Sequence, residues 1–148
     1  MGSIVGRNKE IESLETLYKS NRSEFVIVYG RRRIGKTFLI SSLFEKRMTF
    51  AYTGARNQSQ KIQLQHFAEQ LKLFSKSNYA PELKSWEDAF SQLKELIISL
   101  PTTKRKVIFF DEMPWIDTPK SSFVAALEYF WNAWAAQRND ILFIACGS

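Results

Sequence analysis

The sequence predicts an α/β fold in which helices cover both faces of a parallel sheet. Two observations support this prediction. Four short runs of apolar and aromatic residues have the length of strands, and amphipathic segments with helical spacing separate them along the chain. Alternation of this kind is typical of parallel sheets, because each return to the same end of the sheet needs a crossover connection. A chain of 148 residues, 45% of them hydrophobic, is expected to form one domain with a single core.

The first half of the chain predicts two strands and the helices around them. Apolar side chains fall on one stripe of a short helix at 8–20, with Asn8 as its expected N-cap. The apolar, β-branched and aromatic run at 25–29 has the pattern of a strand covered on both faces, and a helix is expected at 36–46. The short run at 48–52 is the second expected strand.

The second half continues the same alternation. A polar helix is expected at 58–74, and a capping-box-like start opens another long helix at 85–100. An uninterrupted apolar strand at 107–112 ends in two carboxylates. A Thr-Pro helix start then opens the segment 118–138, and the apolar run at 141–148 is the fourth expected strand.

Charge and composition restrict the kinds of partner. The net charge is +6, and residues 1–74 carry 13 Lys and Arg against 6 Asp and Glu, whereas residues 75–148 carry 8 against 9. Nucleic acid, an acidic surface or a nucleotide polyphosphate would each suit this basic half. The single cysteine, Cys146, cannot form an internal disulfide, and no segment has the roughly 20 apolar residues of a membrane span. We therefore expect a cytoplasmic protein without a membrane partner.

Residues 30–37, GRRRIGKT, match the pattern G-x-x-x-x-G-K-S/T between an expected strand and an expected helix. Gly30 and Gly35 allow backbone angles that a Cβ forbids, so the loop can curl its N–H groups around a phosphate. Lys36, expected to be exposed, adds a charge for the β and γ oxygens, and the Thr37 hydroxyl can bind Mg²⁺. The candidate nucleotide-binding residues of this segment are Gly30, Arg31, Arg32, Arg33, Ile34, Gly35, Lys36, Thr37 and Phe38.

Two adjacent carboxylates end the third expected strand. Asp111 matches the second phosphate-binding signature, in which a carboxylate holds Mg²⁺, and Glu112 is placed to polarise an attacking water as a general base. A solvated turn could present the same pair, but the phosphate loop upstream favours the catalytic interpretation. The predicted metal ligands are therefore Thr37 and Asp111, and the predicted catalytic residues include Glu112 and Lys36.

Four segments together resemble the archaeal-type ATPase family, a STAND-like branch of the P-loop ATPases related to AAA+ proteins. They read IVGRNKEIESLETL, VYGRRRIGKTFLI, VIFFDEMPWID and ILFIACGS, and the resemblance covers nearly the whole chain. It implies a three-layer P-loop NTPase fold with strand order 5-1-4-3-2 and the catalytic glutamate on strand three. It also implies a polar sensor residue at the end of strand four, here Ser148 or the Gly147-Ser148 turn, and places Val5, Gly6 and Arg7 near the adenine.

Members of this family continue beyond the position of Ser148 into a fifth strand, a helical lid and further domains. We therefore expect residues 1–148 to be the N-terminal part of the ATPase core, with low activity by themselves. Strand one is then an unpaired sheet edge, which favours self-association. A protein or DNA partner is expected to bind through regions outside this chain. The N-terminal box also departs from the family by reading GRNKE, with Asn8 where an acidic residue is common.

Other conspicuous side chains have simpler interpretations. The arginines at 31–33 must point outward from the loop, where they are solvated or contact nucleotide, a neighbouring subunit's nucleotide or nucleic acid. His66 is expected on the surface of a polar helix. The residues expected to belong to the core or to anchor a domain interface are Trp115, Trp131, Trp134 and Cys146.

The leading functional hypothesis is an ATPase that uses Mg²⁺ to cleave the γ-phosphate and couples cleavage to rearrangement of a larger protein. A nucleotide-dependent switch with little or no hydrolysis is the alternative, and steady-state turnover separates the two. A small-molecule kinase is less well supported, because the expected arginine-rich lid and acceptor pocket are not indicated. The family resemblance implies adenine as the base, and no guanine-reading N-K-x-D is evident. No helix-turn-helix is evident either, so DNA is expected as a partner only of the complete protein.

Overall fold

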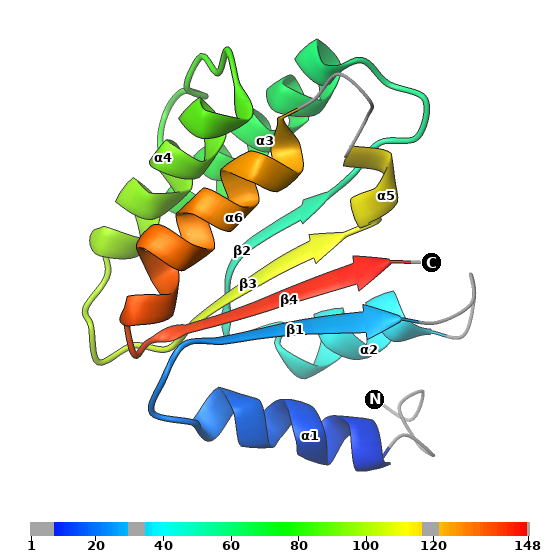
Figure 1. Cartoon of the computed structure of the whole chain (residues 1–148), viewed down its shortest axis with the longest axis vertical. Helices are drawn as coiled ribbons and strands as arrows, with labels where there is room; N and C mark the ends of the chain where they lie inside the picture. The colour runs from blue at the N-terminus through cyan, green and yellow to red at the C-terminus, as the bar shows by residue number, and fades with distance from the viewer. Residues whose placement is uncertain (1–7, 30–34, 117–121, 148) are drawn as a thin grey trace.

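The computed structural model describes residues 8–29, 35–116 and 122–147, which form a parallel sheet between two layers of helices (Figure 1). The elements are α1 (Asn8–Lys19), β1 (Glu24–Tyr29), α2 (Lys36–Leu43), β2 (Met48–Thr53), α3 (Gln60–Ser75), α4 (Trp86–Ile98), β3 (Lys106–Asp111), α5 (Met113–Ile116), α6 (Phe123–Ala133), η2 (Ala135–Gln137) and β4 (Ile141–Gly147). The four strands lie in the order β1-β4-β3-β2, and each neighbouring pair is parallel. The expected three-layer α/β fold is therefore confirmed, and the order agrees with strands 1-4-3-2 of the expected arrangement.

The two central strands, β3 and β4, are buried along their whole length. Phe110 and Phe143 pack into the core on the side of α3, α4 and α6, whereas Phe109 and Ile144 pack on the side of α1 and α2. Figure 1 shows these helices on the two sides of the sheet. Because both faces exclude water, the successive positions 107–110 and 141–146 are apolar on both faces, and each fully buried Phe, Ile, Leu or Val contributes about 1.5–3 kcal/mol.

Aromatic rings fill the larger of the two cores. The ring centroid of Phe110 lies 4.9 Å from that of Phe143 and 5.9 Å from that of Phe67. Trp131 and Trp134 are partly buried against this core, and Cys146 is fully buried in the other, so their expected structural roles are confirmed. His66 is exposed, as expected, and the side chain of Trp115 lies outside the described part of the structure.

The edge strand β1 departs from the expectation that both of its faces are covered. Val26 and Val28 pack against the core under α1 and α2, and Phe25 lies 5.2 Å from Trp131 between ring centroids. Further along the same face as Phe25, however, Ile27 is 50% exposed and Tyr29 is 76% exposed. Trp131 of α6 reaches the amino end of β1, whereas the described helices leave its carboxyl half uncovered. A continuous apolar run does not reveal this difference.

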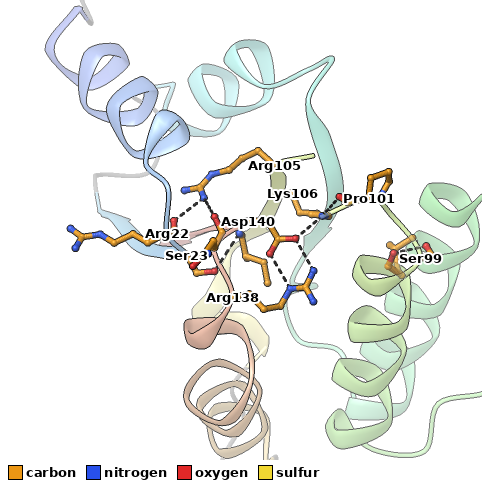
Figure 2. A network of polar contacts seen from close by, with 11 residues as sticks. Arg22, Ser23, Ser99, Pro101, Arg105, Lys106, Arg138 and Asp140 are labelled. Atoms are coloured by element: carbon orange, nitrogen blue, oxygen red, sulfur yellow. Dashed lines mark hydrogen bonds and ion pairs between the residues drawn. The ribbon is translucent and has the colours of Figure 1, made fainter. Parts of the chain in front are cut away.

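Buried charges close the amino end of the sheet (Figure 2). Lys106, at the start of β3, is 0% exposed and its Nζ lies 2.6 Å from Oδ2 of Asp140, which precedes β4. Arg138 binds both carboxylate oxygens of Asp140, at 2.9 and 2.7 Å. Burial opposes ionisation of Asp140, but the hydrogen bonds from Arg138 and Lys106 outweigh it and lower the pKa of the carboxyl group.

Arg105 joins three chain segments beside this ion pair, as Figure 2 shows in part. Its guanidinium donates to carbonyl oxygens at the end of α1, before β1 and before β4, at 2.7–2.9 Å. The carbonyls belong to Leu17, Arg22 and Asn139. One side chain therefore satisfies backbone acceptors from three segments, which fixes the amino end of the sheet.

Several boundaries differ from the sequence prediction. Helix α2 ends at Leu43 rather than at 46, in a turn where the Arg47 N–H bonds the Phe44 carbonyl. The last long helix ends at Ala133 and continues as η2, while its predicted Thr-Pro start lies outside the described residues. Asn8, the predicted N-cap, already has helical structure as the first described residue of α1. Helix α5 is not predicted, since four residues are too few to show periodicity.

Among the described helices, none combines the length and the apolar composition that a membrane span requires.

Candidate functional site

The carboxyl ends of the parallel strands gather the predicted phosphate-loop and acidic residues at one edge of the sheet. Helix α2 begins at this edge with Lys36, directly after Gly35. Gly35 has φ of +83°, in the left-handed region that side chains with a Cβ seldom adopt. The prediction that the loop needs glycine here is therefore confirmed. The first N–H groups of α2 follow immediately and carry the partial positive charge that favours anions.

Thr37 and Asp111, the predicted Mg²⁺ ligands, contact each other. The Thr37 hydroxyl donates to Asp111 Oδ2 at 2.7 Å, and Asp111 is only 4% exposed. Mg²⁺ prefers hard oxygen ligands and usually takes one or two from the protein, with water and phosphate completing its shell. A hydroxyl and a carboxylate that already touch therefore fit this ion, and Asp111 is the member that brings negative charge.

Lys36 differs from its expected exposed state. The side chain is buried, with 6% exposed, and Nζ donates to the carbonyl oxygen of Gly147 at the end of β4. The lysine is buried because it folds inward between the start of α2 and the end of β4, rather than projecting from the surface of the loop. This contact brings the cation close to the carboxyl ends of the central strands.

Glu112 has an unusual backbone. Its φ is +56°, which places a residue with a Cβ in the left-handed region and costs about 1–3 kcal/mol. Its N–H donates to Asp111 Oδ1 at 2.9 Å, so the two acidic residues are joined through the backbone as well as by sequence. Such strain persists where the surroundings enforce it, and it is concentrated at active sites. The conformation turns the chain out of β3 at the residue predicted to be the general base.

Cys146 lies in β4 beneath these charged groups. Burial raises the pKa of the Cys146 thiol to about 12, and the carboxylate of Asp111 adds to the effect while Lys36 opposes it. The thiol is therefore neutral at physiological pH and is not a nucleophile. Its place in the core agrees with the sequence prediction.

Several predicted residues cannot be located at this site. The predicted nucleotide-binding residues outside the described ranges are Val5, Gly6, Arg7, Gly30, Arg31, Arg32, Arg33 and Ile34, and the predicted sensor Ser148 is outside as well. Phe38 is described, and it lies 47% exposed in the first turn of α2. The roles of all these residues remain predictions.

The sequence interpretation missed the turn after β2. Gly54 packs directly beneath Glu112, and Gln63 of α3 is completely buried beside that turn. The only sequence signal is a glycine soon after the expected strand at 48–52, and a glycine in that place equally indicates an ordinary strand end. Gln63 gave no signal, because a glutamine in a polar helix is ordinarily solvated.

Comparison with known proteins identifies a family. Residues 4–148 match the ATPase domain described as predominantly from Archaea. The protein MJECL04 of Methanocaldococcus jannaschii is 34% identical over 112 residues, which cover 75% of this chain and 22% of that protein. The ATP-binding protein MJ0423 of the same organism is 44% identical over 44 residues, which cover 30% of this chain and 75% of that protein.

Two solved structures share the fold. The Walker-type ATPase PABY2304 of Pyrococcus abyssi has a TM-score of 0.64 and 17% identity, covering 96% of this chain and 45% of that one. Drosophila ORC bound to GC-rich DNA and Cdc6 contains a similar chain with a TM-score of 0.53 and 13% identity, covering 99% and 50%. The chain thus spans 22% of MJECL04 and 45% of the Pyrococcus ATPase. The family match, with the contact between Thr37 and Asp111, shows that this chain belongs to the ATPase domain family found predominantly in Archaea.

Proposed function

We propose that this chain binds Mg-ATP at the carboxyl end of its sheet and cleaves the γ-phosphate by attack of water. The observation that supports this most directly is the 2.7 Å hydrogen bond between Thr37 and Asp111, which are 74 residues apart in sequence. It joins the start of the helix after the phosphate loop to the end of β3. Family membership supports ATP binding and hydrolysis in general.

Each residue has a proposed role in this reaction. Lys36 and the first N–H groups of α2 bind the β and γ phosphate oxygens, while Thr37 and Asp111 hold Mg²⁺. When bound, Mg²⁺ neutralises charge on the phosphate oxygens. The Glu112 carboxylate accepts a proton as the water oxygen bonds to the γ phosphorus. The bond to the bridging oxygen breaks, and ADP leaves with its electron pair, so the products are ADP and inorganic phosphate.

Further parts of the proposal rest on the family resemblance. Val5, Gly6 and Arg7 contribute to the adenine pocket, residues 30–34 complete the phosphate loop, and Ser148 senses the γ-phosphate. Hydrolysis drives rearrangement of a larger cytoplasmic protein, and a protein or DNA partner responds to it.

A second candidate function is a nucleotide-dependent switch that hydrolyses ATP slowly and changes its association with other chains. The exposed side chains of Ile27 and Tyr29 favour it, because they lie on the outer strand close to the phosphate loop. These side chains form an exposed apolar face on the outer strand of the described sheet, and together with the backbone edge of that strand they offer a contact for a second copy of the chain. Binding of nucleotide to the loop that follows Tyr29 would then alter that edge.

Single-turnover hydrolysis with excess protein, together with separate measurement of Mg-ATP affinity, tests the proposal. Glu112→Gln should retain affinity within about threefold and slow hydrolysis by about 10²-fold or more, because the amide cannot accept the water's proton. Asp111→Asn should instead weaken the dependence on Mg²⁺. Equal losses of affinity in both variants would contradict these roles. A wild-type chain that binds ATP without hydrolysing it would favour the switch.

A further inference from the structure

The end of β2 supports the backbone of Glu112. The Gly54 N–H donates to the carbonyl oxygen of Asp111 at 2.9 Å. A Cβ placed on Gly54 would lie 2.6 Å from the carbonyl oxygen of Glu112 and 2.6 Å from Cγ1 of Ile116. Ile116 is only 1% exposed, and a backbone oxygen cannot retreat as the tip of a flexible side chain does. Glu112 and α5 can occupy their positions only because residue 54 has no side chain.

The turn that contains Gly54 is itself held by Gln63. This side chain is 0% exposed, and its Oε1 accepts hydrogen bonds from the Ala55 N–H at 2.9 Å and from the Tyr52 hydroxyl at 2.8 Å. Its Nε2 donates to the Ala55 carbonyl at 3.0 Å. One buried amide therefore satisfies both backbone groups of Ala55 and fixes the residues on either side of Gly54. Removing the Gln63 amide would take these hydrogen bonds away from the Tyr52 hydroxyl and from the backbone groups of Ala55.

We propose that Gly54 and Gln63 are positioning residues that hold Glu112 in the orientation needed for hydrolysis, an inference that rests on the proposed role of Glu112. Gln63 fixes Ala55, Ala55 fixes the path of Gly54, and Gly54 packs against the peptide of Glu112. The left-handed conformation of Glu112 persists only while its surroundings enforce it. Loss of either support lets the backbone relax and moves the carboxylate, and a displacement of about 1 Å can lower a rate by about 10²-fold.

Kinetics of matched variants test the proposal. Gly54→Ala adds the obstructing Cβ, and Gln63→Leu removes the amide while keeping a similar volume. The control is Gln70→Leu, because Gln70 lies on the same helix and donates to the β2 carbonyl of Ala51 at 2.8 Å. Single-turnover hydrolysis should fall by about 10-fold or more in the two test variants, with Mg-ATP affinity within about threefold of wild type. The control should retain both values.

The double variant Gly54→Ala, Glu112→Gln shows whether both changes act on the same step. It should be no slower than Glu112→Gln alone, since residues that act as a unit are not additive. A loss of affinity in parallel with hydrolysis would mean a general structural role and would overturn the proposal. If circular dichroism shows that Gly54→Ala does not fold, the hydrolysis rate and Mg-ATP affinity of Gln63→Leu test the proposal instead.

Amide hydrogen exchange without nucleotide tests the positioning separately from the reaction. Exchange in residues 111–116 should become faster in Gly54→Ala and Gln63→Leu and remain unchanged in Gln70→Leu. If the wild type and Glu112→Gln hydrolyse ATP equally slowly, the proposed catalytic function is wrong. In that case the hydrogen-exchange result by itself shows whether Gly54 and Gln63 hold the backbone of Glu112. Unchanged exchange at 111–116 in the folded test variants overturns the proposal.

Discussion

Lys36 and Lys106 are buried lysines at opposite ends of the same sheet, and their surroundings differ. Lys106 is completely buried and pairs with the carboxylate of Asp140 at 2.6 Å. Lys36, at the other end, is directed to the carbonyl oxygen of Gly147. The charge at the amino end is compensated by a carboxylate of the same chain. The cation at the carboxyl end lies at the start of a helix, where a bound anion would add to its stabilisation.

The backbone shows the same contrast between the two ends. At the amino end, Arg105 satisfies carbonyl groups of three segments, which closes this part of the molecule. At the carboxyl end, Gly35 and Glu112 both have left-handed backbones, whereas the other described residues with positive φ lie in an ordinary turn, Asn57, and at the C-cap of α3, Lys76. We conclude that the amino end contributes stability, whereas the carboxyl end carries backbone strain and charge, as the proposed nucleotide site requires.

The largest effect on stability is expected at the amino end. Lys106→Ala should lower the free energy of unfolding by about 3 kcal/mol, because it breaks a buried ion pair, although Arg138 still contacts Asp140. Urea unfolding measures this change, and affinity for Mg-ATP should be unaffected once the protein is folded. The matched control is Lys104→Ala, at an exposed neighbouring lysine, which should change stability by less than about 0.5 kcal/mol. If Lys106→Ala and Lys104→Ala change the free energy of unfolding by similar amounts, the buried pairing of Lys106 with Asp140 does not stabilise the fold.

The opposite pattern is expected for the lysine at the carboxyl end. Lys36→Ala should weaken Mg-ATP binding by about 100-fold, which is about 2.7 kcal/mol, because a charge facing the phosphates is lost. The free energy of unfolding without nucleotide should fall by only about 1 kcal/mol, because the lost hydrogen bond to the Gly147 carbonyl is partly offset by relief from burying an ammonium group. Calorimetric titration and urea unfolding measure the two quantities, with exposed Lys46→Ala as control. If folded Lys36→Ala binds Mg-ATP as tightly as the wild type, Lys36 does not contribute to nucleotide binding and the proposed difference between the two lysines is wrong.

Acid pH should act on the amino end through Asp140. Its folded-state pKa is lowered from the ordinary value of 3.8, so its contribution to stability is present above pH 3.8 and is lost as pH falls through the folded-state pKa. Unfolding measured from pH 5 to about pH 2 should show this loss. Asp140→Asn should flatten the curve more than Glu15→Gln, since the Asp140 carboxylate accepts hydrogen bonds from two cations, Arg138 and Lys106, whereas that of Glu15 accepts them from Arg47. Equal flattening would show that the second cation adds nothing to the effect of Asp140.

The smallest effect on stability is expected at the uncovered half of β1. If this apolar edge associates with a second copy, sedimentation should show concentration-dependent association, and Tyr29→Lys should reduce it. Stability should change by less than about 0.5 kcal/mol, because Tyr29 is 76% exposed. Tyr79→Lys is the control, since Tyr79 is 73% exposed but lies away from the edge. Equal changes in association for both variants would locate the contact elsewhere.

The sequence by itself determined the fold class and the central strands, and it predicts most of the residues of the proposed site. The continuous apolar runs of β3 and β4 identified strands covered on both faces, because a strand without a solvent-facing side shows no polar alternation. The spacing of Gly35, Lys36 and Thr37 predicts a phosphate loop, since backbone freedom and helix-terminal charge are local properties. The carboxyl ends of parallel strands share one edge, so Asp111 could be assigned to the same site.

Only the tertiary structure decided which surfaces are covered and which distant groups meet. The run at β1 resembles the central strands in sequence, yet half of one face is exposed because α6 reaches only its amino end. The burial of Lys36, the pairing of Lys106 with Asp140 and the approach of Gly54 to Glu112 join groups from different elements. Local sequence patterns predict the helices, the strands and the functional side chains at their ends. Contacts between distant groups depend on how the layers pack, because a side chain's neighbours are supplied by the whole fold.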